Sequence, residues 1–452
     1  WPLPRVLRAL SQLLRHTRIL RIEEERFRFA HPLLVEVCGE FLAAAERRTV
    51  HLRLGTIIEE RQGDPEELAF HFYRAGAFER ALAHLLKAAQ RARNAFAYEE
   101  AQRFLVQAQE AVDSQDGTVS EAAVRQLLLQ RAEVEDRLGN PDAALTLCQR
   151  VLRAGDRRGS ALALMQMGWT QYRKGDWRES MRLYETSVGL FAELGDEVQM
   201  TIVYVRLGNI YFERGELDEA ITRFSDAKAL AVQCGEWALL GTLYGNLGVI
   251  DSIRGHYVEA VLNYSEALNA YRRVQHSYGI CQTYHNLGMT HADQEQWQKA
   301  LQWYGKAEEL AREMGTVDVE ANVLVSAAVA QLEVGDLEAS DKSCLLARRH
   351  MEQLGDRPGL AECGKVEGMI LRQRGAHTLA CERLQMGRHL FAELDNALGI
   401  AECDMELGRL ELARAAGEQA RSHFTAAQLA FAKLGAEDDA RRAAEALAQL
   451  TS

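Results

Sequence analysis

Histidine and cysteine side chains can bind a metal or act as a base or nucleophile. His31 and His51 have no carboxylate or thiol at motif spacing, so we interpret both as structural or solvated. Cys363 and Cys403 stand 40 residues apart. We interpret that spacing as the same small buried residue recurring at two equivalent positions, and not as a pair of metal ligands. We therefore expect no catalytic residue, no metal site and no cofactor.

Phosphate chemistry has equally little support. The chain contains no GxxxxGK[ST] motif, so we expect no nucleotide bound through a Walker loop. A net charge of -12 argues against broad contact with a nucleic-acid backbone. The arginines near the N-terminus flank three glutamates, Glu23, Glu24 and Glu25, which would repel phosphate. We expect no nucleic-acid contact through this chain.

The composition favours long helices and reduced thiols. Only 6 of 452 residues are proline, and 47% are hydrophobic. The eight cysteines are scattered without a CxxC pair, and no apolar run is long enough to cross a bilayer. We therefore expect a cytoplasmic location and no membrane partner. The chain begins at Trp1 without a starter methionine, so we interpret it as part of a longer protein.

A repeat of 40 residues must position any functional residue. One column of this repeat is small: Gly168, Gly208, Gly248, Gly288, Ala328, Gly368 and Gly408. Seven residues later a second column reads Gly175, Gly215, Gly255, Glu295, Gly335, Gly375 and Ala415. A third column is Ser180, Ala220, Ala260, Ala300, Ser340, Ala380 and Ala420. A fourth is bulky in most units: Tyr184, Phe224, Tyr264, Tyr304, Cys344, Leu384 and Phe424.

Each column has a physical reading. Apolar residues on both sides of the second column recur with helical spacing, so each unit is predicted to be two helices. Glycine in the second column suits the left-handed conformation that ends the first helix. The first and third columns are small because the paired helices approach closely there. The bulky residue fills the space that they leave.

This pattern resembles the tetratricopeptide repeat, over residues 155–436, in seven units of 40 rather than the usual 34 residues. Units of this length are similar to those of Leu-Gly-Asn-repeat polarity proteins. They are also similar to the sensor domains of bacterial signal-transduction ATPases of the STAND type, such as the maltose-regulon activator. The resemblance implies an all-α fold, a right-handed solenoid of antiparallel helix pairs.

Three further regions complete the predicted organisation. Residues 61–154 read as irregular helical repeats, and residues 437–452 read as a capping helix with a polar face. Residues 1–60 read as helix, hairpin near residues 18–30, and helix. That order resembles the winged-helix module that joins an ATPase core to such repeats. It implies that the ATPase lies outside this chain.

The resemblance implies that first helices line a concave groove. The expected groove residues are Trp169, Tyr172, Arg206, Asn209, Phe212, Asn246, His285 and Asn286. An asparagine side chain can pair with both N–H and C=O of an extended backbone, and such asparagine ladders occur in kinesin light chains and Leu-Gly-Asn-repeat proteins. The alternative is that Asn246 and Asn286 bond neighbouring helices.

We therefore expect a binding and sensing module of a bacterial regulatory protein, and not an enzyme. Its ligand would be a protein or peptide segment in the groove, or else a small-molecule inducer. It would relay occupancy to an effector outside this chain. A static scaffold is the remaining alternative. The sequence leaves the oligomeric state open.

Overall fold

The computed structural model of the chain describes residues 20–23, 26–29, 43–95, 97–114 and 119–450. Its first elements are two antiparallel strands, β1 (Leu20–Glu23) and β2 (Arg26–Phe29). They confirm the predicted hairpin. Residues 1–19 and 30–42 lie outside the described residues, so the winged-helix-like module remains a prediction.

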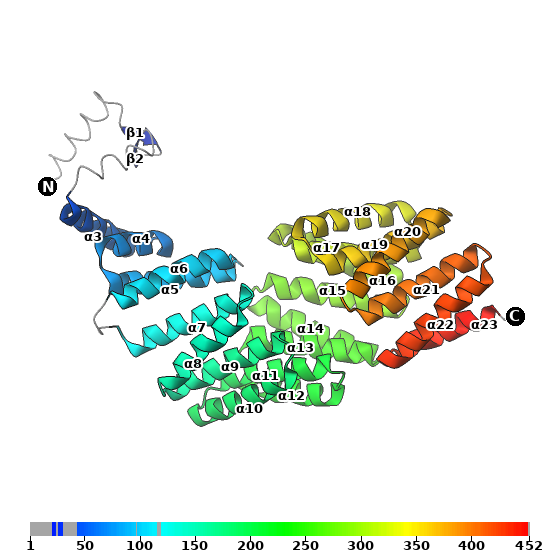
Figure 1. Cartoon of the computed structure of the whole chain (residues 1–452), viewed down its shortest axis with the longest axis horizontal. Helices are drawn as coiled ribbons and strands as arrows, with labels where there is room; N and C mark the ends of the chain where they lie inside the picture. Colours follow the sequence, from blue (N-terminus) through cyan, green and yellow to red (C-terminus); the bar gives the residue numbers. More distant parts are fainter. Residues whose placement is uncertain (1–19, 24–25, 30–42, 96, 115–118, 451–452) are drawn as a thin grey trace. The chain divides into compact units, whose positions relative to one another are not determined.

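The chain divides into two compact units, Trp1–Asp196 and Glu197–Ser452, here called unit 1 and unit 2. The helices of unit 1 are α3 (Ala44–Glu60), α4 (Pro65–Ala75), α5 (Phe78–Asn94), α6 (Tyr98–Asp113), α7 (Glu121–Arg137), α8 (Pro141–Arg153), α9 (Arg157–Arg173) and α10 (Trp177–Leu194) (Figure 1). The boundary follows α10, so it falls within the predicted run of seven repeats, after the first of them.

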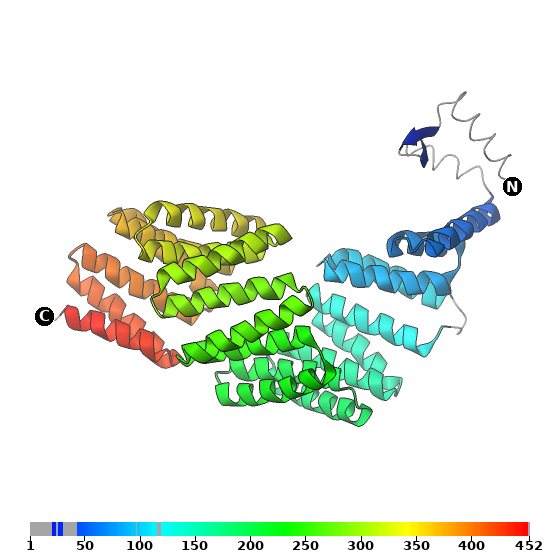
Figure 2. The ribbon, with the colours of Figure 1, turned by 180° about the vertical axis from the view of Figure 1, so that it is seen from behind.

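Unit 2 contains six helix pairs and a final single helix. The pairs are α11 (Glu197–Glu213) and α12 (Leu217–Cys234), α13 (Trp237–Ile253) and α14 (Tyr257–Arg273), α15 (Ser277–Asp293) and α16 (Trp297–Met314), α17 (Val317–Glu333) and α18 (Leu337–Leu354), α19 (Arg357–Gln373) and α20 (His377–Glu393), and α21 (Ala397–Ala413) and α22 (Gly417–Leu434). The last helix is α23 (Glu437–Gln449). Figure 2 shows the pairs of unit 2 stacked in chain order, from green to red.

The turn inside each pair forms where glycine was predicted to end the first helix. Gly175, Gly215, Gly255, Gly335 and Gly375 have φ between 74° and 86°. Two repeats lack glycine at this position, yet Glu295 and Ala415 adopt the same left-handed conformation, with φ of 58° and 59°. The surrounding helices therefore impose the turn even where the residue does not favour it.

The small and bulky columns contact each other as predicted. A Cβ atom added at Gly208 would lie 2.4 Å from a ring carbon of Phe224, which is 1% exposed. Where the third column is serine, its hydroxyl donates a hydrogen bond to the carbonyl of the first column. Ser180 bonds Gly168 and Ser340 bonds Ala328, each at 2.7 Å. Both hydroxyls are therefore satisfied inside the core.

Candidate functional site

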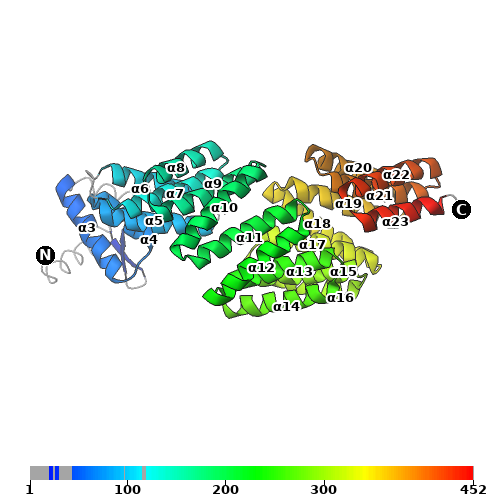
Figure 3. The same cartoon turned by 90° about the horizontal axis from the view of Figure 1, so that it is seen from below.

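The first helices of unit 2 lie side by side. Helix α11 contacts α13, and the same contact continues through α15, α17, α19 and α21. The face that these six helices form is called the groove below. Figure 3 shows several of these helices from below, with α19 and α21 beside the final helix α23.

A cavity of about 330 Å³ opens in the groove between α15 and α17. Its lining includes Gln282, His285, Met289, Asn322, Val325 and Ser326. Four of them, His285, Met289, Val325 and Ser326, stand in the repeat positions that were predicted to face a ligand, whereas Gln282 and Asn322 do not. The structure thus places His285, one of the expected groove residues, in the wall of a cavity.

His285 is held in this wall as a neutral side chain. Its Nε2 lies 2.9 Å from Ser326 Oγ, and its ring lies 5.7 Å from that of Tyr304. Burial lowers the pKa of His285 to about 4. At neutral pH the imidazole is therefore a neutral hydrogen-bonding group, and not a cation.

Acid should destabilise the chain through His285. Between about pH 6.5 and pH 4 the unfolded state binds the proton while the folded state does not, so stability falls as the pH falls. Between pH 7 and pH 4.5 the free energy of unfolding of wild type should fall by about 1 to 2 kcal/mol more than that of His285→Gln. Chemical denaturation measures this difference. The exposed His389 provides the control, because His389→Gln should leave the loss unchanged. Equal losses in wild type and His285→Gln would contradict this assignment.

The expected asparagines differ in their contacts. Asn246 Nδ2 donates to Asn209 Oδ1 at 3.2 Å, from α13 to α11. Asn286 on α15 is half-buried, and its side-chain amide makes no hydrogen bond to any described residue. The structural alternative therefore applies to Asn246, whereas Asn286 has unused hydrogen-bonding capacity.

The other expected residues are divided between the two units. Arg206 is half-buried on α11, and Phe212 packs against the core of α12 and α13. Trp169 and Tyr172 belong to unit 1, where their ring centroids lie 5.3 Å apart with the rings tilted by 33°. The Arg137 guanidinium lies 5.3 Å from the Trp169 ring. Six of the eight expected residues thus belong to unit 2 and two to unit 1.

Comparison with known proteins decides the type of repeat. Residues 199–273 and 280–314 match two family models, each described as tetratricopeptide repeat. The helix pairs of unit 2 form a right-handed tetratricopeptide-repeat solenoid. No curated protein matches the chain in sequence.

Solved structures share this fold at low sequence identity. The apo form of RapI is 11% identical, with a TM-score of 0.61 over 78% of this chain and 98% of that chain. Aspartyl phosphate phosphatase F from Bacillus subtilis is 10% identical, with a TM-score of 0.55 over 77% and 94%. The Rap conjugation gene regulator of plasmid pLS20, solved with a Phr peptide, is 12% identical, with a TM-score of 0.51 over 81% and 97%. These similarities show a common fold.

A second cavity of the tetratricopeptide groove, of about 650 Å³, was not predicted. Helices α19 and α21 supply Lys365, Met369, Glu402, Met405, Glu406 and Arg409 to its wall. Lys365 occupies the column of His285, Glu406 that of Asn246, and Arg409 that of Asn209. Charge in groove-facing columns was therefore the signal that could have revealed this cavity.

The charges of the second cavity are organised as shared ion pairs. Lys365 lies between Glu362, at 2.7 Å, and Glu402. Burial lowers the pKa of the Lys365 amine, but the two carboxylates outweigh burial and raise it, so the amine stays charged. Glu406, only 5% exposed, lies between Arg372 and Arg409. Buried charges are tolerated here because each has a partner of opposite sign.

The final helix α23 does more than cap the tetratricopeptide array. Its residues Asp439, Arg441, Arg442 and Glu445 line the second cavity, together with Trp297 from the start of α16. Burial raises the pKa of the nearby Asp293, whose carboxyl also interacts electrostatically with Arg442 and Asp439. Helix α23 therefore supplies part of the wall of the second cavity.

The two thiols that stand 40 residues apart are part of the core of the array. Cys363 and Cys403 are 1% and 0% exposed, and burial raises the pKa of Cys403 to about 12. Cys363 Sγ lies 3.5 Å from Met351 Sδ. Among the described residues, no three His, Cys, Asp or Glu side chains gather at a metal-binding distance. Nor does that part of the chain contain a helix with the length and apolarity to span a membrane.

Proposed function

We propose that this chain is a regulatory binding module that holds an extended peptide in the groove of unit 2. One observation carries the proposal: equivalent first-helix positions line both cavities of the groove. They supply Met289 and Ser326 to the smaller cavity, and Glu406 and Arg409 to the larger. A solenoid is stabilised by contacts between neighbouring repeats, so side chains on its open face are available to a ligand.

The chemistry of the groove supports a peptide as the ligand. Asn286 can donate and accept a hydrogen bond at once, as the backbone of an extended peptide requires. Asn246 Nδ2 already donates one hydrogen bond to Asn209, and the remaining hydrogen-bonding capacity of this side chain is available to the peptide. The peptide complex of a protein with the same fold is consistent with this use of the groove.

The module would act by relaying peptide binding through residues 1–60 to an effector outside this chain. A signal-transduction ATPase in a bacterial cytoplasm is the effector that we propose. The relay differs from a static scaffold in a measurable way. Hydrogen exchange of α3 should change when peptide binds if the relay operates, and should not change for a scaffold.

Removing the two asparagine side chains should weaken peptide binding. We expect Asn246→Ala with Asn286→Ala to raise the dissociation constant at least about tenfold, which corresponds to about 1.4 kcal/mol. The melting temperature should remain nearly unchanged, because Asn246 loses only one partly exposed hydrogen bond. The measurement is calorimetric titration with a peptide selected from a random library on the immobilised chain.

The matched control is Asn269→Ala, which changes an exposed asparagine on the second helix α14. This variant should bind the peptide as tightly as wild type. Normal binding by the double variant would remove these residues from the site. Unfolding of the double variant would instead favour the structural role for the two asparagines.

A further inference from the structure

Unit 1 contains a face with the properties of a binding site, formed by α5, α7 and α9. A cavity of about 720 Å³ is lined by His84, Lys87 and Gln90 of α5 and by Gln126 and Gln130 of α7. A second cavity, of about 390 Å³, shares Gln126 and Gln130 and extends to Gln166 on α9. The two cavities thus follow one another across three neighbouring helices, which are called the unit 1 face below.

Four polar atoms of this face have no hydrogen-bond partner among the described residues. They are His84 Nδ1, Arg93 Nε, Gln130 Oε1 and Gln166 Nε2. His84 and Gln130 are each only 7% exposed, so water does not readily solvate them. Leaving a buried polar group unpaired costs free energy, and native proteins pair the great majority of such groups. A cluster of them beside two cavities indicates that their partner is a ligand.

The tautomer of His84 follows from its neighbour Glu59. Hydrogen bonds from His84 and then from Arg80 keep the pKa of Glu59 below its usual value, so Glu59 is ionised and accepts. His84 Nε2, at 3.0 Å from Glu59 Oε1, therefore carries the proton. When Nε2 alone carries the ring proton of His84, the unpaired Nδ1 is an acceptor.

The unpaired atoms are two acceptors and two donors. His84 Nδ1 and Gln130 Oε1 accept, whereas Gln166 Nε2 and Arg93 Nε donate. A phosphate or carboxylate would satisfy only the donors. An extended polypeptide presents N–H and C=O groups in turn, so its main chain satisfies both kinds.

Three of the four cations that line the two cavities already have carboxylate partners, which disfavours nucleic acid. Arg93 pairs with Glu133, and Arg80 pairs with Glu59. Arg125 pairs with Asp156 at 2.8 Å. Binding to a phosphate backbone requires cations that can release counterions, and these three arginines instead have carboxylate partners.

We propose that the unit 1 face is a second binding site, separate from the groove of unit 2, which holds an extended polypeptide through its main-chain amides. Packed helices lie roughly 8 to 10 Å apart, and an extended chain advances about 3.3 Å per residue. Each step from one helix to the next therefore spans about three residues. The two steps from α5 through α7 to α9 therefore need a segment of about six residues.

The test is a selection of random twelve-residue peptides on the full chain carrying Asn246→Ala and Asn286→Ala, which weakens the proposed groove site. Selected peptides are then titrated into wild type and into Gln130→Met with Gln166→Met. We expect a class of peptides whose affinity falls at least about tenfold in the methionine variant. N-methylation of single amides in these peptides should produce a similar loss, because it removes main-chain donors.

Gln102→Met is the matched control, because Gln102 Nε2 already donates to Glu135 Oε1 at 3.0 Å. It should not change the affinity of these peptides. In the free chain, Gln130→Met should raise the melting temperature, since it removes an unpaired buried atom, whereas Gln102→Met should lower it. The proposal is overturned if no selected peptide depends on Gln130 and Gln166, or if Gln130→Met lowers the melting temperature as Gln102→Met does. Both outcomes are independent of the groove of unit 2.

Discussion

Phe224→Cys is expected to lower the free energy of unfolding by about 3 kcal/mol, because it leaves a cavity at a site that is 1% exposed. Gly208→Ala should cost about 1 to 3 kcal/mol, since the new Cβ would lie 2.4 Å from the Phe224 ring. The two changes together should cost less than their sum, by about 1 to 2 kcal/mol. The reason is that the double variant copies a pair found elsewhere in the array, Ala328 with Cys344.

Urea denaturation of the four proteins measures this coupling as a double-mutant cycle. Gly305→Ala is the control for the glycine change, because a Cβ at this exposed helical position meets nothing within 4 Å. Gly305→Ala should leave the free energy of unfolding unchanged or raise it by about 0.5 to 1 kcal/mol. Equal effects at Gly208 and Gly305, or strict additivity in the cycle, would contradict the size matching between the two columns.

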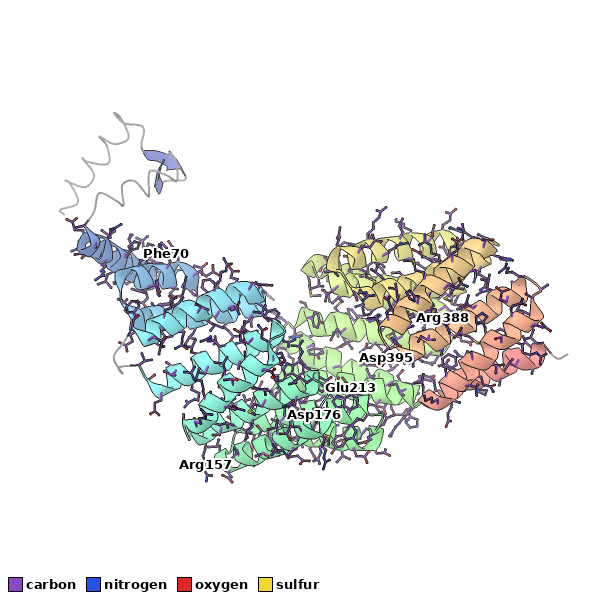
Figure 4. All side chains as sticks on the ribbon, in the orientation of Figure 1. Phe70, Arg157, Asp176, Glu213, Arg388 and Asp395 are labelled. Atoms are coloured by element: carbon purple, nitrogen blue, oxygen red, sulfur yellow. The ribbon has the colours of Figure 1, made fainter. Side chains whose placement is uncertain are left out.

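Arg388→Met is expected to lower the free energy of unfolding by about 2 kcal/mol. Arg388 extends from α20 (Figure 4) and donates two hydrogen bonds to Asp404, at 2.9 and 3.1 Å. Asp404 is 4% exposed. Burial raises its pKa, but hydrogen bonds from His423 and Arg388 outweigh burial and keep the pKa below its usual value. Without Arg388 the buried carboxylate of Asp404 keeps only His423 as a partner, and this loss lowers the stability of the folded chain.

Arg157→Met makes the same change at the surface and is the matched control. Arg157, also labelled in Figure 4, pairs with Glu193, and both side chains are more than half exposed. Solvent screens such a pair, so its loss should cost less than about 1 kcal/mol. Thermal or urea denaturation of both variants tests the difference. Comparable losses would mean that the Asp404 pair contributes no more than a surface pair.

Much of the fold follows from local patterns that are readable in the chain. The 40-residue step located the helix pairs and the left-handed turns, including the turn at Gly215. It also located the contact between Gly208 and Phe224. These features depend on spacing along one helix or across one turn, where the chain itself limits the geometry. The choice of the first helices as the face that bears the groove came instead from the resemblance to tetratricopeptide repeats.

The partners of individual side chains depend instead on how separate helices meet. The bond between Asn246 and Asn209 joins residues 37 apart, and the Lys365 ion pair with Glu402 spans the same separation. Spacing along one helix does not specify the offset and crossing angle that bring such atoms within hydrogen-bonding distance. Helical periodicity likewise carries no information on the part that α23 takes in the second cavity, on the division after Asp196, or on the unpaired atoms beside Gln130. These features arise only when all the repeats are packed.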